Sequence, residues 1–496
     1  MSLIIKWKRL VEEIKSHWFD AYIVWGAVRD LLLDIEPDDV DIATNMPIES
    51  LSKVFDIHDI WKNKDFWIVV VNFEWDDFEV AQFRWDWEYL DWRRPESVVF
   101  VKTIEEDLSR RDFTVNAMAY DWKNFIDPFG WQEDLKNRII KFVWNPIERI
   151  SEDHLRILRA LRFAAKLSEM PNALNNFTNI NAKIDTKSMD AIVNSSYLIR
   201  NISKERITQE IIKVAKLWWE KFANFLQVTQ QFWILEEILW PIHKSYYFQH
   251  NFDNHPEWQE PTWMNRVFSH IVESVRLYDW NDPLTLLCIL FHDIGKPFSY
   301  SFEYDEKKTN EPHRHRYKWH DVIWESFFRR YAANELKLPW EWIDIISYCI
   351  LNHMNWWNIE KMNKKNIYKI VSSEYYPYLE KVVSCDERST FCENNLDIKF
   401  YLMQNWINKT DERLNNILKI ASDVRQEFWE KKEFDRYVKS IFKWEDIINR
   451  FWVSWKEVWR LIEIWINWII SEWINDKDII LNYIEANNGS WSVQIS

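Results

Sequence analysis

The chain has 496 residues, a formal net charge of −15 and 47% hydrophobic residues, so it is long enough for several folded domains. The acidic balance argues against a protein that coats nucleic acid, because neutralising phosphates needs clustered Lys and Arg, but it allows a local basic cleft. No run of about 18 apolar residues is present, and the amphipathic start at residues 3–19 is unlike a secretion signal, so we expect a cytoplasmic protein without membrane spans.

The tryptophan content is abnormal. The chain has 35 tryptophans and 4 glycines, whereas glycine ordinarily makes up about 7% of residues. Several tryptophans fall where turns belong, as in residues 74–76 (EWD) and 355–358 (NWWN), and it is glycine that tolerates the backbone of such turns. We interpret most of these tryptophans as glycine codons (UGA) translated with the wrong code table; the alternative is a protein that is genuinely rich in tryptophan.

The first 145 or so residues favour an α/β arrangement. Residues 21–45 read as a strand, a tight turn, a short helix at 27–33 and a second strand at 40–42. Two further strand-like runs, residues 66–73 and 77–84, are joined by a turn-like stretch at 74–77.

Two carboxylates mark a candidate site in this region. Asp39 and Asp41 are two residues apart, so on an extended strand they would project from the same face. Such a pair suits Mg²⁺ with nucleotide phosphates. Gly26 leads into a helix N-terminus that would attract phosphate, with Arg29 one turn along. Glu79 could supply a third carboxylate, or it could be an ordinary exposed strand residue.

From Ser151 onward the 3.6-residue period dominates and the chain reads as almost wholly helical. We expect linkers or surface loops in the polar stretches near 168–185, 250–262 and 300–318. The four cysteines contain no CxxC pair, and we expect buried, reduced thiols at Cys288, Cys349, Cys385 and Cys392.

A second candidate site is spread over the helical part. His292 and Asp293 end an apolar helix that Gly295 and Pro297 stop. Further candidate ligands come from other segments: His270, His320, His353 and Asp386. Together they suit one or two divalent transition metal ions, although a single histidine on a helix is more often an ordinary core residue.

Six segments occur in order: VWGAVRD (24–30), DVDIAT (39–44), EVAQFR (79–84), EEDLSRRDFTVNAMAYD (105–121), DPFGWQEDL (127–135) and SEDHLRILRALRFAAKL (151–167). They resemble the successive motifs of the class II tRNA nucleotidyltransferase and poly(A) polymerase family. Reading Trp25 as glycine gives the first motif its family form. An indole at residue 25 would instead occupy the volume where a triphosphate must approach the backbone.

The resemblance implies roles for individual residues. The metal-binding pair would be Asp39 and Asp41, holding two Mg²⁺ ions that bridge the triphosphate and activate the primer 3′-OH. The nucleotide-binding residues would be Gly26, Arg29, Arg111 and Asn116. The pair that reads the base would be Asp153 and Arg156, followed on the same helix by Arg159 and Arg162.

The chemistry of the base-reading pair can be argued directly. Three residues apart on one helix, Asp153 and Arg156 would be neighbours on one face. A guanidinium that donates and a carboxylate that accepts suit cytosine and adenine, whereas uracil and guanine present the opposite pattern. A polar group left unpaired by the wrong base costs about 1–3 kcal/mol. The alternative is an Arg-rich helix that only forms structural ion pairs.

Residues 262–390 resemble the HD-domain phosphohydrolase superfamily, which implies a metal site of His270, His292, Asp293 and Asp386. His320 and His353 match positions found in two-metal members, and the metal would be of the Mn, Ni or Co type. The tail from about residue 448 resembles the C-terminal segment of HD-containing members. The sequence therefore predicts an α+β fold with a nucleotidyltransferase head (1–145), a helical neck and body (146–250), an HD domain (255–400) and a helical tail (401–496).

The leading functional prediction is addition of CCA to the 3′ end of tRNA from CTP and ATP. One alternative is a poly(A) polymerase or an enzyme restricted to CC or A addition. Another is a metal-dependent HD phosphohydrolase whose head only binds nucleotides. None of these functional predictions determines the oligomeric state.

Overall fold

The computed structural model describes residues 3–24, 26–32, 40–58, 68–89, 95–168, 184–249, 266–304, 313–356, 358–389 and 411–427. Two predicted features, Trp25 and Asp39, lie outside these residues, as do Cys392 and most of the predicted tail. The chain forms two compact units, one of Met1–Trp356 with Pro377–Leu414 and one of Trp357–Tyr376 with Asn415–Ser496.

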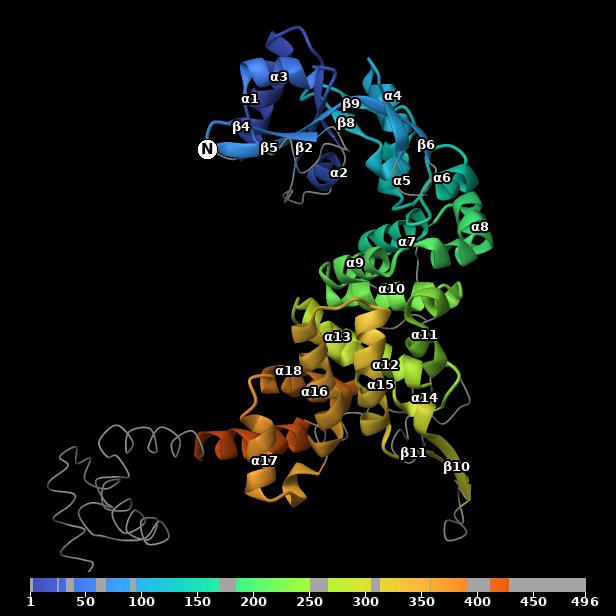
Figure 1. Ribbon diagram of the computed structural model, residues 1–496, viewed down its shortest axis with the longest axis vertical. Helices are drawn as coiled ribbons and strands as arrows, with labels where there is room; N and C mark the ends of the chain where they lie inside the picture. Colours follow the sequence, from blue (N-terminus) through green and yellow to red (C-terminus); the bar gives the residue numbers. More distant parts are fainter. Residues whose placement is uncertain are drawn as a thin grey trace, which may run out of the picture. The chain divides into compact units, whose positions relative to one another are not determined.

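A seven-stranded sheet forms the first part of the chain, in the order β3-β4-β5-β2-β1-β8-β9 (Figure 1). Its strands are β1 (Ala21–Val24), β2 (Asp41–Thr44), β3 (Asp56–His58), β4 (Ile68–Phe73), β5 (Asp76–Gln82), β8 (Ala119–Tyr120) and β9 (Phe125–Ile126). β2 and β5 pair in parallel and the other neighbours are antiparallel. Three helices accompany the sheet: α1 (Leu3–Ser16), α2 (Gly26–Leu32) and α3 (Ile48–Val54). The predicted strands are therefore confirmed to within two residues at each end.

Two hairpins depart from the predictions. β6 (Arg84–Tyr89) pairs with β7 (Pro95–Phe100), although no strand was expected there. β10 (Tyr300–Tyr304) pairs with β11 (His313–Tyr317), inside the stretch predicted as a loop. The alternation of tyrosine and phenylalanine with polar residues in β10 is a strand pattern, so the expectation of a loop at 300–318 was wrong for these residues.

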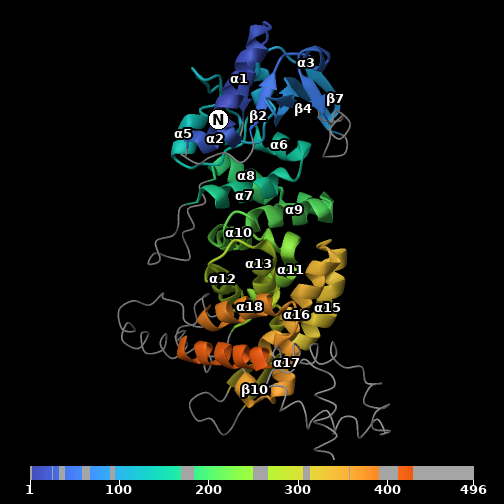
Figure 2. The same cartoon turned by 90° about the vertical axis from the view of Figure 1, so that its left-hand side faces the viewer.

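The remaining elements are helical, which confirms the predicted α+β class. They include α4 (Ile104–Ser109), η2 (Thr114–Asn116), α5 (Trp131–Lys136), α6 (Pro146–Glu152), α7 (Arg156–Leu167), α8 (Thr186–Asn194), η3 (Ser196–Asn201), α9 (Lys204–Ala215), α10 (Trp219–Gln231) and α11 (Leu235–Ser245). They continue with α12 (Val267–Arg276), α13 (Pro283–Phe291), α14 (Lys296–Ser299), α15 (His320–Asn334), α16 (Trp340–Trp356), η5 (Ile359–Lys361), α17 (Lys364–Val371), α18 (Tyr376–Ser389) and a helical stretch at 411–427. α7, α9 and α10 pack on one another (Figure 2). Within the described part of the chain, no helix combines the length and apolarity that a membrane crossing needs.

Local sequence explains where several helices begin. Thr103 and Glu106 form a capping box at the start of α4, which satisfies two backbone donors that the first turn leaves open. Asp282 accepts hydrogen bonds from the backbone N–H groups of Leu284 and Thr285 at the start of α13, with Pro283 at the first helical position. This start fixes the direction of the apolar helix that ends at Phe291, directly before His292.

Tryptophans occupy left-handed backbone positions. Among the described residues, nine that are not glycine have positive φ, and six of these are tryptophans: Trp18, Trp75, Trp122, Trp144, Trp233 and Trp319. Trp18 and Trp233 each follow a helix at the position where glycine usually ends it. Side chains with a Cβ disfavour this conformation by about 1–2 kcal/mol. The structure therefore has a glycine-type backbone at these six residues.

The turn between β4 and β5 is the clearest case. Phe73 pairs with Asp76, which leaves Glu74 and Trp75 as a two-residue loop with φ of 52° and 71°. Positive φ at both central residues defines a type I′ turn, in which the second position is most often glycine. Trp75 is 95% exposed, so its indole has little packing to offset the strain.

Replacing Trp75 with glycine should raise the free energy of unfolding by about 1 kcal/mol, because the left-handed strain is relieved and little packing is lost. Urea titration followed by circular dichroism measures the change. Trp340 is the matched control, since it is 68% exposed and begins α16 without a positive φ. W340G should bring no stabilisation. An equal effect of W75G and W340G would contradict the turn assignment.

Candidate active site and metal centre

One row across the sheet contains two of the predicted acidic residues. Asp41 is the parallel partner of Glu79, and on its other side it faces Val24, which in turn faces Ala119. Register partners on parallel strands project from the same face, so Asp41 and Glu79 are neighbours, as predicted. β1 ends at Val24 and α2 begins at Gly26, which places the helix start beside this row. Asp39 lies outside the described residues.

A buried polar network joins the head to α7. Arg29 donates from Nη1 to Asn116 Oδ1 over 3.2 Å, and Asn116 donates from Nδ2 to Asp112 Oδ1 over 3.1 Å. Arg159 donates to Asp112 Oδ2 from both Nε (2.7 Å) and Nη2 (2.6 Å). Asn116 and Arg159 therefore both bind the Asp112 carboxylate, and Arg29 is linked to it through Asn116.

Asp112 remains ionised in this network. Burial would raise its pKa, but the adjacent Arg159 guanidinium and the Asn116 amide outweigh burial and hold the pKa at about 2. The ring of Phe163 lies under Arg162, with the guanidinium carbon 4.3 Å from the ring centre, and Arg29 is 5.6 Å from the same centre. The arginines are thus oriented by a carboxylate and an aromatic ring that the sequence prediction did not name.

Arg111 belongs to a neighbouring cluster. Its Nη2 lies 2.9 Å from Asp107 Oδ2, and Arg110 Nη2 lies 2.8 Å from Asp107 Oδ1. Burial, together with Arg110, lowers the pKa of Arg111 to about 9, against the opposing attraction of Asp107. The Arg111 guanidinium is therefore held close to a second cation, an arrangement that an anionic ligand would relieve.

The predicted base-reading pair is arranged differently from the expectation. α6 ends at Glu152 and α7 begins at Arg156, so Asp153 lies in the connection and not on the same helix. The Asp153 carboxylate accepts two hydrogen bonds from Arg206 Nη2, of 2.9 and 3.0 Å. Arg156 instead pairs with Glu152. The one-helix prediction was wrong because Asp153 caps the following turn through the N–H of Leu155.

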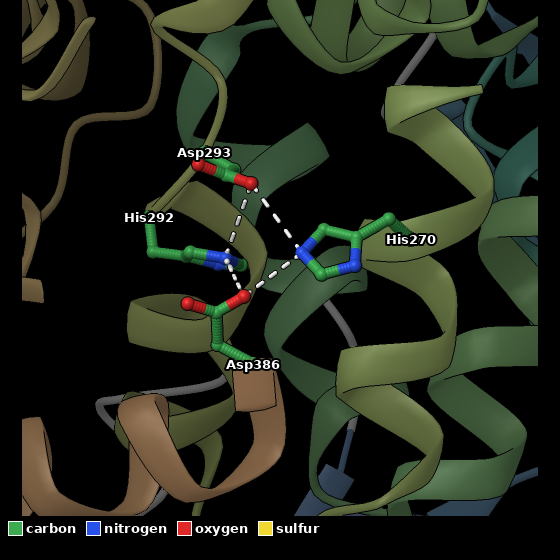
Figure 3. Close-up of side chains that lie close together, drawn as sticks. All are labelled: His270, His292, Asp293 and Asp386. Carbon is green, nitrogen blue, oxygen red and sulfur yellow. Dashed lines mark hydrogen bonds and ion pairs between the residues drawn. The ribbon is translucent and has the colours of Figure 1, made fainter. Parts of the chain in front are cut away.

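The second predicted cluster converges in one buried place (Figure 3). His270 comes from α12, His292 and Asp293 follow α13, and Asp386 comes from α18. The ligand atoms of these four residues all lie within 4.8 Å of one another. His270 Nε2 is 2.9 Å from Asp386 Oδ1 and 3.4 Å from Asp293 Oδ2, while His292 Nε2 is 3.5 Å from both of these oxygens.

A second group shares Asp293. Its other oxygen, Oδ1, lies 3.2 Å from His320 Nε2 and 3.5 Å from His353 Nε2. The two Nε2 atoms are 3.1 Å apart. Because each oxygen of Asp293 faces a different pair of histidines, this carboxylate could bridge two metal ions.

The tautomers of three of these histidines leave a lone pair on Nε2 that can bind a cation. The Nδ1 atoms of His292, His320 and His353 lie 2.7, 2.8 and 2.7 Å from backbone carbonyl oxygens. A carbonyl only accepts, so each Nδ1 carries a proton and, in the neutral ring, Nε2 presents a lone pair. His292 Nε2 is buried without a hydrogen-bond partner. Lone pairs that face carboxylates and one another repel unless a cation lies between them, so the donor set fits a divalent metal.

The carboxylates of this centre are ionised. Burial would raise the pKa of Asp386, but His292 and His270 hold it well below its usual value. The pKa of Asp293 is likewise held low, against burial, by Lys296 and His292. Burial is the main reason that the pKa of His353 is lowered. The pKa of His292 is instead raised, against burial, by Asp293 and Asp386. Metal binds ionised carboxylates and neutral imidazole, so a metal ion would displace the proton that these carboxylates favour on His292.

Gly295 allows α14 and α15 to approach closely. A Cβ at residue 295 would lie 2.0 Å from the backbone oxygen of His320 and 2.8 Å from Trp324 Cβ. His320 is the first residue of α15 and a member of the second metal group. The close contact of glycine with this backbone therefore sets the position of one proposed ligand.

Replacing Gly295 with alanine should lower the free energy of unfolding by about 1–3 kcal/mol, because backbone atoms must shift to accept the methyl group. Thermal or urea unfolding measures this. Gly26 is the matched control, since a Cβ there would meet only Arg29 Nη2, at 3.5 Å. If G295A is no less stable than G26A, the close packing of α14 against α15 is not as described.

The N-terminal part of the chain is similar to known proteins. Residues 21–141 match the poly A polymerase head domain. This segment contains Asp41, Glu79, Arg111 and Asn116. The chain is 44% identical over 206 residues to a CCA-adding enzyme of Geobacillus kaustophilus, covering 41% of this chain and 48% of the relative. It is 40% identical over 226 residues to a CCA-adding enzyme of Streptococcus mutans, covering 45% and 53%. The matched part thus spans about half the length of these curated relatives.

Solved structures resemble the chain over nearly its whole length. The crystal structure of Bacillus stearothermophilus CCA-adding enzyme in complex with CTP matches with a TM-score of 0.56 and 22% identity, covering 99% of both chains. The structure of a CCA-adding enzyme in apo form II matches with a TM-score of 0.53 and 18% identity, covering 98% of this chain and 96% of that one. At these identities the similarity concerns the fold.

Proposed function

We propose that the chain adds C and A nucleotides to the 3′ end of tRNA, using CTP and ATP. The observation that carries the proposal is the relatives named CCA-adding enzymes, 40–44% identical over more than 200 residues. The register that sets Asp41 beside Glu79 supports it, because paired acidic side chains on neighbouring strands can hold the metal ions of nucleotidyl transfer. The proposed partners are therefore CTP, ATP and the tRNA 3′ end.

The proposed site residues in the first part of the chain would have two roles, metal binding and nucleotide binding. Asp41, together with Asp39 and Glu79, would hold Mg²⁺, which when bound supplies charge neutralisation at the triphosphate and activation of the 3′-OH. Gly26, Arg29, Arg111 and Asn116 would orient the nucleotide. The hydrogen bonds from Arg29 to Asn116 and from Asn116 to Asp112 support this role. They hold buried hydrogen-bond donors from α2 and η2 close together.

Base selection would use Asp153 and Arg156. Both side chains are engaged in the structure, Asp153 with Arg206 and Arg156 with Glu152. A guanidinium has five donors and an ionised carboxylate about four acceptor positions, so each retains capacity for a base edge. Arg159 and Arg162 would stabilise this face of α7 through Asp112 and Glu210.

The test is an extension assay with purified protein and tRNA that lacks CCA. The tRNA is offered CTP alone, ATP alone, or both, and the products are resolved at single-nucleotide length. Addition that requires CTP first and then ATP supports CCA addition. Long A-tails, or C addition alone, would support a poly(A) polymerase or a partial enzyme instead.

A second candidate activity rests on the buried histidine cluster. We propose that His270, His292, Asp293 and Asp386 bind a divalent transition metal of the Mn, Ni or Co type, with His320 and His353 binding a second ion through Asp293. The burial of all six residues and the unpartnered Nε2 of His292 support this. Such a site, in a domain of the HD type, could activate water against a phosphomonoester or phosphodiester. Release of phosphate without tRNA extension would make hydrolysis the main activity.

We also propose that most tryptophans of the printed sequence are glycines in the native protein, encoded by UGA. The six tryptophans with positive φ support this, because glycine is the residue that suits their backbone. Some indoles, in contrast, are well packed, such as Trp324, which is 1% exposed and stacks on Phe298. Intact-mass measurement on the native protein decides the matter: a mass near 61.2 kDa would refute the proposal.

The domain organisation also remains a prediction. We propose a head at 1–145, a neck and body at 146–250, an HD domain at 255–400 and a helical tail at 401–496 that helps to hold tRNA. A cytoplasmic location is proposed with the tRNA substrate.

A further inference from the structure

His270 differs from the other three histidines of the metal centre. The Nδ1 protons of His292, His320 and His353 are held by backbone carbonyls three residues earlier in their own segments. No side-chain substitution removes those partners. His270 Nδ1 instead lies 2.9 Å from the hydroxyl of Ser389, which is 119 residues away in sequence and on α18.

The Ser389 hydroxyl connects two ligands. Besides contacting His270, it donates to the backbone oxygen of Asp386 over 2.8 Å. Ser274, one turn after His270 on α12, lies 2.9 Å from Ser389 Oγ and 2.9 Å from the His270 backbone oxygen. Ser274 is fully buried and Ser389 is 1% exposed. Hydrogen bonds thus join His270 and Ser274 on α12 to Asp386 and Ser389 on α18 in one network.

The two ring nitrogens of His270 face different partners. Nδ1 lies 2.9 Å from Ser389 Oγ, and Nε2 lies 2.9 Å from Asp386 Oδ1 and 3.4 Å from Asp293 Oδ2. Because Ser389 donates its own proton to the Asp386 backbone oxygen, its Oγ can accept a hydrogen bond from a proton on Nδ1. A metal ion can bind Nε2 only in this Nδ1-protonated form of the neutral ring, so the contact with Ser389 favours the metal-binding tautomer.

We propose that Ser389 is a positioning residue of the metal centre, which holds His270 in the metal-binding tautomer and couples it to Asp386. The inference rests on the metal site proposed above. Groups that hold the second nitrogen of a ligating histidine typically contribute about 10- to 100-fold to metal affinity. The Nδ1 partner described for His270 is the Ser389 side chain, whereas for His292, His320 and His353 it is a backbone carbonyl.

The test uses the full chain with three variants: S389A, S389T and S384A. Ser384 is the matched control, since it lies on α18 and donates to the Glu380 backbone oxygen but makes no contact with the cluster. Co²⁺ affinity is measured by competition with a chelator. We expect S389A to bind one equivalent of Co²⁺ about 10- to 100-fold more weakly, S384A to match the parent, and S389T to recover affinity through its hydroxyl.

A second readout separates positioning from general destabilisation. In metal-free protein labelled with ¹⁵N-histidine, the chemical shifts of the ring nitrogens report the tautomer of His270. S389A should shift His270 away from the Nδ1-protonated form and leave His292 unchanged. Unchanged affinity and tautomer in S389A, or equal losses in S389A and S384A, would overturn the role of Ser389. If the parent protein binds no Co²⁺ while its tautomers respond as expected, the proposed metal site fails and the tautomer control by Ser389 stands.

Discussion

Asp41→Asn should abolish nucleotide addition, with a loss of roughly 10³-fold in the rate of C incorporation. The substitution keeps the shape of the side chain and removes the negative charge that would hold Mg²⁺. Bound metal contributes several kcal/mol of transition-state stabilisation, and each 1.4 kcal/mol is a factor of ten. Single-turnover extension of tRNA lacking CCA, at saturating CTP, measures the loss, with Trp25→Gly in the parent and in every variant.

Asp56→Asn is the control for this experiment. Asp56 begins β3 at the edge of the same sheet, and its carboxylate is exposed near His58. D56N should retain the parent rate, and both variants should unfold at the parent temperature. A D41N protein that is folded and extends tRNA at the parent rate would remove the nucleotidyl-transfer proposal.

Protein with tryptophan at residue 25 should be inactive in nucleotide addition, and Trp25→Gly should restore activity by at least about 100-fold. Val24, which precedes residue 25 in the sequence, ends β1 opposite Asp41, and Gly26, which follows it, begins α2. An indole there would compete with the triphosphate for space, and misplacing reacting groups by about 1 Å already costs roughly 100-fold. Steady-state extension assays on the two proteins measure the difference.

The matched control is Trp233→Gly. Trp233 has a φ of 60°, is 55% exposed and lies between α10 and α11, away from the sheet. In the protein that retains Trp25, W233G should change stability and restore no nucleotide addition. Robust activity in the protein that retains Trp25 would refute the steric argument, whatever its effect on folding.

Much of the head was predictable because its signals are local. The strands that carry Asp41 and Glu79 follow from short apolar runs bounded by turns, and their pairing brought the two residues together. The break before α7 was missed because no proline or glycine marks it. Asp153 lies directly after α6 and caps the next turn through the N–H of Leu155, and Arg206, which binds its carboxylate, is 53 residues away.

The members of the histidine and aspartate cluster could be predicted from the sequence, but the residues that support them could not. Histidines and aspartates on separate apolar helices suggested a cluster, and the described structure unites all six predicted residues. Ser389 and Ser274 gave no such signal, because serine is common on helices and its value here depends on a contact between segments 115 residues apart. The role of Asp112 could not be predicted either, since its partners Arg159 and Asn116 come from different elements.

The left-handed positions have a practical consequence for making the protein. Trp18, Trp75 and Trp319 are 97%, 95% and 73% exposed, so a host that inserts tryptophan at these codons would cover its product with large apolar groups that favour aggregation. A poorly soluble recombinant product would then reflect the host's translation and not the native fold. Rewriting those codons for glycine before expression should yield soluble material at the same concentration.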